Sequence, residues 1–94
     1  MSTFFMFGKY STDSVKYISG QRTDETRKAI EDLGGQVQEI YALLGEYDLV
    51  FIVRFPNMTD AMKAAIALGR LTGISFSTAA AVTVEEFDQL VGNL

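Results

Sequence analysis

A phenol and a carboxylate stand side by side where the most apolar segment of the chain begins. Tyr47 and Asp48 follow Gly45 and precede a strand-forming run that ends at Phe55. In a pocket, such a carboxylate can act as a general base and such a phenol can donate to an oxyanion. Neighbouring side chains of a regular strand point to opposite faces, so a regular strand would keep the two groups apart.

The same residues also have a purely structural interpretation. Gly45 would make the turn, Asp48 would accept hydrogen bonds at the strand end, and Tyr47 would pack at the rim of an interface with its hydroxyl in water. We favour this interpretation over a catalytic one. We expect Asp48 to organise the hairpin, with its charge satisfied by turn amides or by the cations of Arg54 or Lys9.

Other polar groups lie on strands that are otherwise apolar. Arg54 has the same strand parity as Asp48, and a charge among apolar neighbours usually needs a partner. The candidate ligand-binding residues are therefore Tyr41, Gly45, Tyr47, Asp48 and Arg54. The cations expected to be solvated on a helix are Arg22, Arg27 and Lys28.

Composition excludes several kinds of chemistry. The chain has 94 residues, no histidine, no cysteine and a formal net charge of −4. Thiolate and imidazole metal sites are therefore impossible, and we expect neither a metal nor a cofactor. An acidic chain without a clustered basic face argues against nucleic acid. The apolar start MSTFFMFGKY has no basic leader and is too short for a membrane span, so we expect a cytoplasmic protein with no membrane partner.

Apolar periodicity and turn-forming residues predict the elements in the first half. A strand is expected over 3–10, and then a short helical stretch capped by Ser11 and Thr12. A second helical piece is expected to start at the cap Thr23 and to end at Gly34-Gly35, and its predicted buried stripe is Ala29, Ile30 and Leu33. Strands over 36–44 and 47–55 are expected to form a hairpin with a tight reversal at Gly45-Glu46.

The second half predicts two further helices and one strand. Asn57 is expected to cap a helix that stops at Gly73, and its predicted packing face is Met62, Ala65, Ile66, Leu68 and Gly69. A strand follows over 74–82. Thr83 and Glu86 form a capping box for a short last helix, whose apolar residues are Phe87, Leu90 and Val91.

This order predicts a single α+β domain over residues 1–94. It is the ferredoxin-like arrangement β-α-β-β-α-β, in which both crossover helices cover one face of a four-stranded antiparallel sheet. Both faces of the predicted sheet are apolar, since Phe51 and Val53 alternate with Val50 and Ile52. Two helices cover only one face, so we expect a homodimer, or a higher homo-oligomer, formed through the other.

Several stretches resemble the GYD-domain family. They are GKYS near the start, the GG pair before the second strand, and YALLGEYDLVFIV followed by LGRLTGISFSTAAAVTVEEF. The family takes its name from the residues matched here by Gly45, Tyr47 and Asp48. The resemblance implies a dimeric α+β barrel, in which ferredoxin-like subunits pair through their sheets, and it implies no settled activity.

The chain is also similar to the effector domains of leucine-responsive-type transcriptional regulators. The similarity rests on the glycine, acidic residue, aromatic residue and aspartate before the third strand, and on Leu68, Gly69, Leu71, Gly73 and Ile74. In those proteins this region lies near small-molecule sites between subunits. No helix-turn-helix segment is present, so their DNA-binding role does not carry over.

Two classes of function are compatible with these observations. The favoured one is a non-enzymatic module that binds a small molecule or serves assembly or regulation. The alternative is a cofactor-independent isomerase or monooxygenase acting on a small hydrophobic or aromatic substrate. A closed pocket inside the subunit that Asp48, Tyr47 or Tyr41 reaches would favour the enzyme, whereas a filled core with polar groups at subunit boundaries would favour the module.

Overall fold

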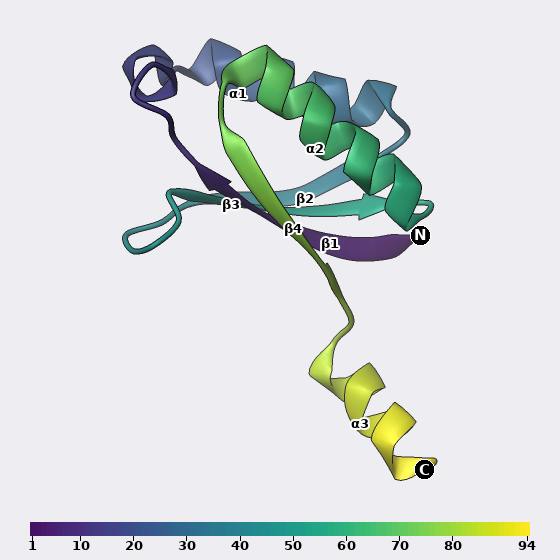
Figure 1. Ribbon diagram of the computed structural model, residues 1–94. Coiled ribbons are helices and arrows are strands. Elements are labelled where there is room, and N and C mark those ends of the chain that lie inside the picture. Colours follow the sequence, from purple (N-terminus) through teal and green to yellow (C-terminus); the bar gives the residue numbers. More distant parts are fainter.

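The computed structural model describes residues 1–94 as a sheet with two helices packed on one face (Figure 1). The elements in chain order are β1 (Ser2–Lys9), the 3₁₀ helix η1 (Ser14–Tyr17), α1 (Gly20–Asp32), β2 (Gln36–Ala42), β3 (Leu49–Phe55), α2 (Met58–Thr72), β4 (Ser75–Ala81) and α3 (Val84–Gly92). The strand order is β2-β3-β1-β4, and every pair is antiparallel. This confirms the predicted ferredoxin-like fold with a short C-terminal helix.

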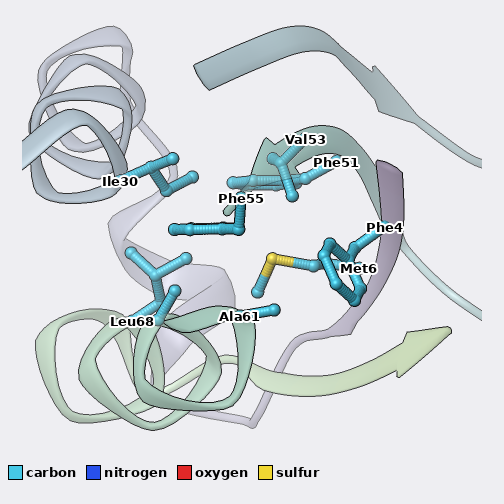
Figure 2. Packing of buried hydrophobic residues seen from close by; sticks show 9 residues of the cluster. Phe4, Met6, Ile30, Phe51, Val53, Phe55, Ala61 and Leu68 are labelled. Atoms are coloured by element: carbon cyan, nitrogen blue, oxygen red, sulfur yellow. The ribbon is translucent and has the colours of Figure 1, made fainter. Parts of the chain in front are cut away.

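The core lies between the sheet and the two helices. Alternate residues of β1 and β3 point to this side, and Figure 2 shows them directed at side chains of α1 and α2. The buried cluster consists of Phe4, Met6, Ile30, Phe51, Val53, Phe55, Ala61, Ala64 and Leu68. Each large apolar side chain buried here contributes about 1.5 to 3 kcal/mol, so this cluster is the main source of stability within the protomer.

The start of α1 differs from the prediction. Ser19 is the N-cap, and its hydroxyl accepts a hydrogen bond from the Arg22 amide at 3.0 Å. Thr23 lies inside the helix, where its hydroxyl donates to the Ser19 carbonyl, so the prediction that Thr23 begins the helix is wrong. Gly20 occupies the first helical position. A single glycine lowers the stability of a helix by at most about 1 kcal/mol, so the helix can begin there. Leu33 is exposed rather than part of the buried stripe.

Helix α2 begins and ends where predicted, but it buries a different face. Asn57 accepts from the Asp60 amide at 2.9 Å, and Gly73 ends the helix in the left-handed conformation with φ of 75°. The residues buried against the sheet are Ala61, Ala64, Leu68 and Thr72, whereas Met62 and Ile66 are exposed. Only Leu68 of the predicted packing face is buried, because apolar side chains surround more than half of this helix and periodicity alone cannot choose among them.

The β2–β3 hairpin closes with a wider loop than predicted. The Leu43 amide donates to the Asp48 carbonyl at 2.8 Å, which leaves Leu44–Tyr47 as the loop that projects from the sheet in Figure 1. The prediction of a tight reversal at Gly45-Glu46 is therefore wrong. Tyr47 and Asp48 precede β3 instead of lying in it, so strand parity does not fix their directions.

Helix α3 begins at the predicted cap, since the Thr83 hydroxyl accepts from the Glu86 amide at 3.1 Å. Figure 1 shows α3 extending away from the sheet on the side opposite to α1 and α2. None of its residues is buried. A bilayer-crossing helix would need to be longer and more apolar than any helix in this structure.

Candidate functional site

The sheet face opposite the helices is apolar at its centre. The register places Phe5 opposite Ile52 and Phe7 opposite Val50, with all four side chains on this open face. Neither α1 nor α2 covers it (Figure 1). The prediction that both faces of the sheet are apolar is confirmed.

One end of the open face is hollowed. The hollow has a volume of about 490 Å³ and lies between the strand ends and the start of α3. Its apolar part comes from Phe5, Ile52 and Ala81, and its polar groups include Thr3, Gln38, Arg54 and Glu86. Its volume lies within the range of sites that bind small molecules, and its lining is more polar than in most of them.

Arg54 is the cation of this hollow. Its Nη2 donates to the Met1 carbonyl at 2.9 Å, and the side chain is half-buried. The protomer contains one ion pair, between Lys16 and Asp13, so no carboxylate oxygen lies within 4.0 Å of a nitrogen of Arg54, although Glu86 lines the same hollow. A guanidinium has five N–H donors, which leaves Arg54 able to hold a carboxylate in a bidentate manner.

Asp48 lies at the other end of the sheet from Arg54. Its Oδ2 accepts from the Tyr10 amide at 2.8 Å, and its own amide donates to the Gly8 carbonyl at 2.9 Å. Asp48 and Arg54 are six residues apart, and the chain between them is extended from Leu49, so their Cα atoms are separated by roughly 20 Å. The expected pairing between Asp48 and Arg54 is therefore wrong. The donor is neither a turn amide nor Lys9, but the backbone just after β1.

The remaining predicted residues are spread over the open face and the loop. The Tyr47 ring packs on Phe7 with centroids 5.2 Å apart, which directs it to the open face. Tyr41 lies opposite Val50 in β2 and is 51% exposed. Gly45 is exposed in the loop. Of the five candidates only Arg54 lines the hollow, so the structure does not gather them into one site.

Five polar residues of the hollow were not predicted as site residues, and they are Ser2, Thr3, Gln38, Thr83 and Glu86. Thr3 lies opposite Arg54 in the β1–β3 register and could have been found from that register. Glu86 reaches the hollow because only Val82 and Thr83 separate β4 from α3. Gln38 lies at an irregularity of the β2–β3 register between Val37 and Glu39, for which the sequence gives no signal.

The space between the sheet and α1 is almost filled. A cavity of about 40 Å³ remains, lined by Tyr10, Arg22, Ile40, Leu49, Phe51, Ile74 and four neighbours. That volume holds on the order of one water molecule. Tyr41, Tyr47 and Asp48 do not line it.

Arg22 borders this cavity and is not the solvated charge that was predicted. Its Nη1 donates to the Ser14 carbonyl at 2.6 Å, and its guanidinium lies 5.7 Å from the centre of the Tyr10 ring. The side chain is half-buried as a result. Ser14 is itself held by reciprocal bonds with Ser11, so Arg22 ties α1 to the segment that follows β1.

Replacing Asp48 tests its structural role. We expect Asp48→Ala to lower the free energy of unfolding by on the order of 1 to 3 kcal/mol, because the Tyr10 amide loses a charged acceptor. Asp48→Asn keeps an acceptor oxygen and should cost clearly less. Urea denaturation at one protein concentration measures both. Equal stability of all three proteins would contradict the role and make a binding role the better explanation.

Several solved structures are similar to this chain over most of its length. A protein from Thermus thermophilus is 27% identical with a TM-score of 0.58, and the match covers 88% of this chain and 95% of that one. The Mycobacterium tuberculosis feast or famine regulatory protein, complexed with L-methionine, is 12% identical with a TM-score of 0.59. That match covers 88% of this chain and 51% of the regulator, so the chain spans about half the length of that protein.

An enzyme has the same fold. A mutant chlorite dismutase from Candidatus Nitrospira defluvii is 19% identical with a TM-score of 0.59, over 88% of this chain and 42% of that one. At such identities the likeness shows the fold alone. No curated protein sequence matches the chain. A family model described as the GYD domain matches residues 4–91, which confirms the resemblance noted in the sequence.

Proposed function

We propose, from the premise that this chain belongs to the GYD-domain family, that it works as a homodimer that binds a small molecule and catalyses no reaction. The observation that carries the proposal is the open sheet face, with an apolar centre and a hollow at one end. The apolar centre supports the dimer, and the hollow supports the ligand site.

The dimer follows from the composition of the open face. Phe5, Phe7, Val50 and Ile52 form its centre on two neighbouring strands. A contiguous apolar patch of this kind is typical of an interface rather than of a surface left in water. A two-fold axis would place the same patch of a second copy against it. Val50 is already buried in the protomer and Phe5, Phe7 and Ile52 are half-buried, so the gain comes from their remaining exposed apolar area, at about 25 cal/mol per Å².

The chemistry of the hollow supports one class of ligand. Arg54 has free donors and no carboxylate partner, while Phe5, Ile52 and Ala81 offer apolar contact next to it. A small carboxylic acid with an apolar group matches this arrangement. The structurally similar regulator was crystallised with L-methionine, which has such chemistry, so amino acids are the first ligands to test.

The alternative remains a cofactor-independent isomerase or monooxygenase for a small hydrophobic or aromatic substrate. Such an enzyme needs a pocket that holds the substrate beside an acid or a base. The cavity of about 40 Å³ beside α1 is too small for that, and it is not lined by Tyr41, Tyr47 or Asp48. These features support the binding module over an enzyme whose site lies inside the subunit.

A thermal-shift screen of amino acids and small aromatic acids tests the ligand site. We expect a bound carboxylate to raise the melting temperature of the parent, and Arg54→Gln to weaken its binding roughly tenfold to a hundredfold, as for a lost charged hydrogen bond. Arg27→Gln, on the exposed side of α1, is the matched control and should leave binding unchanged.

Other results would contradict the proposal. Chemical conversion of any compound in the screen would favour the enzyme. Equal binding by the parent and Arg54→Gln would remove the hollow as the site. A well-folded parent that remains monomeric at micromolar concentration would overturn the dimer.

A further inference from the structure

Helix α3 has an apolar face that nothing in the protomer covers. Val84, Phe87, Leu90 and Val91 are each at least half exposed, at 74%, 57%, 63% and 50%. Their spacing of three, three and one residues places them along one side of the helix. Helices of nine residues are marginal in water without tertiary packing, so this face requires a partner surface.

The partner surface cannot be helix α2 of the same chain. The sheet separates the two, with α2 on one side and α3 on the other (Figure 1). Only Val82 and Thr83 connect β4 to α3, and two residues span at most about 7 Å. That is less than the diameter of one helix, about 10 to 12 Å, so α3 cannot pass the sheet to reach its own helix layer. We propose that α3 packs in trans on α2 of a second copy of the chain.

Helix α2 presents an apolar stripe of matching character. Met58, Met62 and Ile66 recur every four residues beside the core face and are 65%, 60% and 62% exposed. Next to Ile66 a hollow of about 440 Å³ lies between α2 and β4, lined in part by Gly69 and Phe76. The hollow can receive a large side chain such as Phe87 of a second copy.

The charges of the two surfaces are complementary. Helix α3 carries Glu85, Glu86 and Asp88 and none of the eight cations of the chain. Lys63 and Arg70 lie beside the stripe on α2, and Arg70 also lines its hollow. The acidic character also argues against a membrane as the partner, because helices that lie on anionic lipid carry Lys and Arg on their polar face. Two α3 helices packed together would place like charges close to each other.

The proposal rests on the dimer through the open face, which also explains how α3 reaches its site. Thr83 and Glu86 line the hollow on the open face, so α3 starts on the side where the partner's sheet would lie. Packed sheets are about 10 Å apart, and nine helical residues extend about 13 Å. Val82 and Thr83 add up to about 7 Å, so the last residues of α3 reach roughly 20 Å, past the partner's sheet to its helices, which lie about one helix diameter beyond that sheet.

Site-specific cross-linking of the full chain tests whether α3 packs on α2 of a second copy. The chain has no cysteine, so introduced thiols are the only ones. Chains carrying Leu90→Cys are co-expressed with chains carrying Ile66→Cys, so that a mixed disulfide can form only between copies. We expect this mixed disulfide to be the main product of mild oxidation. Lys28→Cys, on the exposed side of α1, replaces Ile66→Cys as the control and should give little product.

Charge reversal provides a second readout. Lys63→Glu with Arg70→Glu on the Ile66→Cys chain should slow the mixed disulfide roughly fivefold, as for the loss of two surface ion pairs. Asp88→Lys on the other chain, next to the apolar face of α3, should restore part of the rate.

The possible failures are distinguishable by light scattering on the same samples. An intact dimer that forms no mixed disulfide, forms it no faster than the Lys28→Cys control, or joins two Leu90→Cys chains instead overturns the site on α2 and leaves the open-face dimer standing. A monomeric parent overturns both.

Discussion

Ile52→Lys should convert the dimer to a folded monomer at micromolar concentration. Ile52 lies opposite Phe5 near the centre of the open face and is only half-buried in the free protomer, so lysine can point into water there. In the proposed dimer the new ammonium would be buried without a partner, once in each copy. A buried unpaired charge costs about 3 to 5 kcal/mol, which corresponds to a weakening of the dimer by at least about a hundredfold.

Light scattering after size exclusion measures this change, and circular dichroism shows whether the variant stays folded. The control is Leu44→Lys, which places the same charge on an apolar residue in the projecting β2–β3 loop. It should remain a dimer like the parent. If Ile52→Lys stays dimeric, the copies meet through another surface, and the edge strand β4 or the stripe on α2 becomes the candidate.

The fold was predictable because its strands and caps are marked locally. Both central strands alternate apolar side chains on two faces, and Asn57, Gly73 and Thr83 bound α2 and α3 through hydrogen bonds that the sequence indicates. The buried face of α2 was not predictable in this way. Ala61 and Ala64 are buried while the larger Met62 is exposed, because close approach of the helix to the sheet favours small side chains.

The candidate site was harder to predict because it depends on contacts between distant parts of the chain. The partner of Asp48 is the amide of Tyr10, 38 residues away. The register of β1 against β3 then brings Thr3 and Arg54 together at the far end of the sheet. Sequence reasoning selected Arg54 as a charge among apolar neighbours, but it could not separate this end of the open face from the end that holds Asp48.

Gly35→Ala should destabilise the protomer more than any other glycine substitution in this chain. A Cβ at Gly35 would lie 2.5 Å from Cε1 and 2.6 Å from Cζ of Phe55, and 2.9 Å from Cγ2 of Ile30. Both neighbours are fully buried, so neither can move into free space. The pair Gly34-Gly35 thus has two separate requirements, since Gly34 takes the left-handed conformation with φ of 86° and Gly35 allows the helix–sheet contact.

Overpacking of this kind costs about 1 to 3 kcal/mol, and we expect a value near the upper end because the clash involves an aromatic ring. The melting temperature should fall by roughly 10 °C or more. Gly20→Ala is the matched control, since a Cβ added at Gly20 would have no atom within 4 Å and alanine favours a helix start. Its stability should equal or slightly exceed that of the parent.

A double mutant connects the Gly35→Ala effect to its cause. Phe55→Leu removes the ring atoms that the new methyl group would meet, so Gly35→Ala should cost less in the Phe55→Leu background than in the parent. Urea unfolding of the four proteins at one concentration gives this coupling free energy, and a fixed concentration keeps the contribution of dimerisation comparable. If the two substitutions are additive, the ring is not what excludes a side chain at position 35, and the close contact between α1 and β3 does not depend on glycine there.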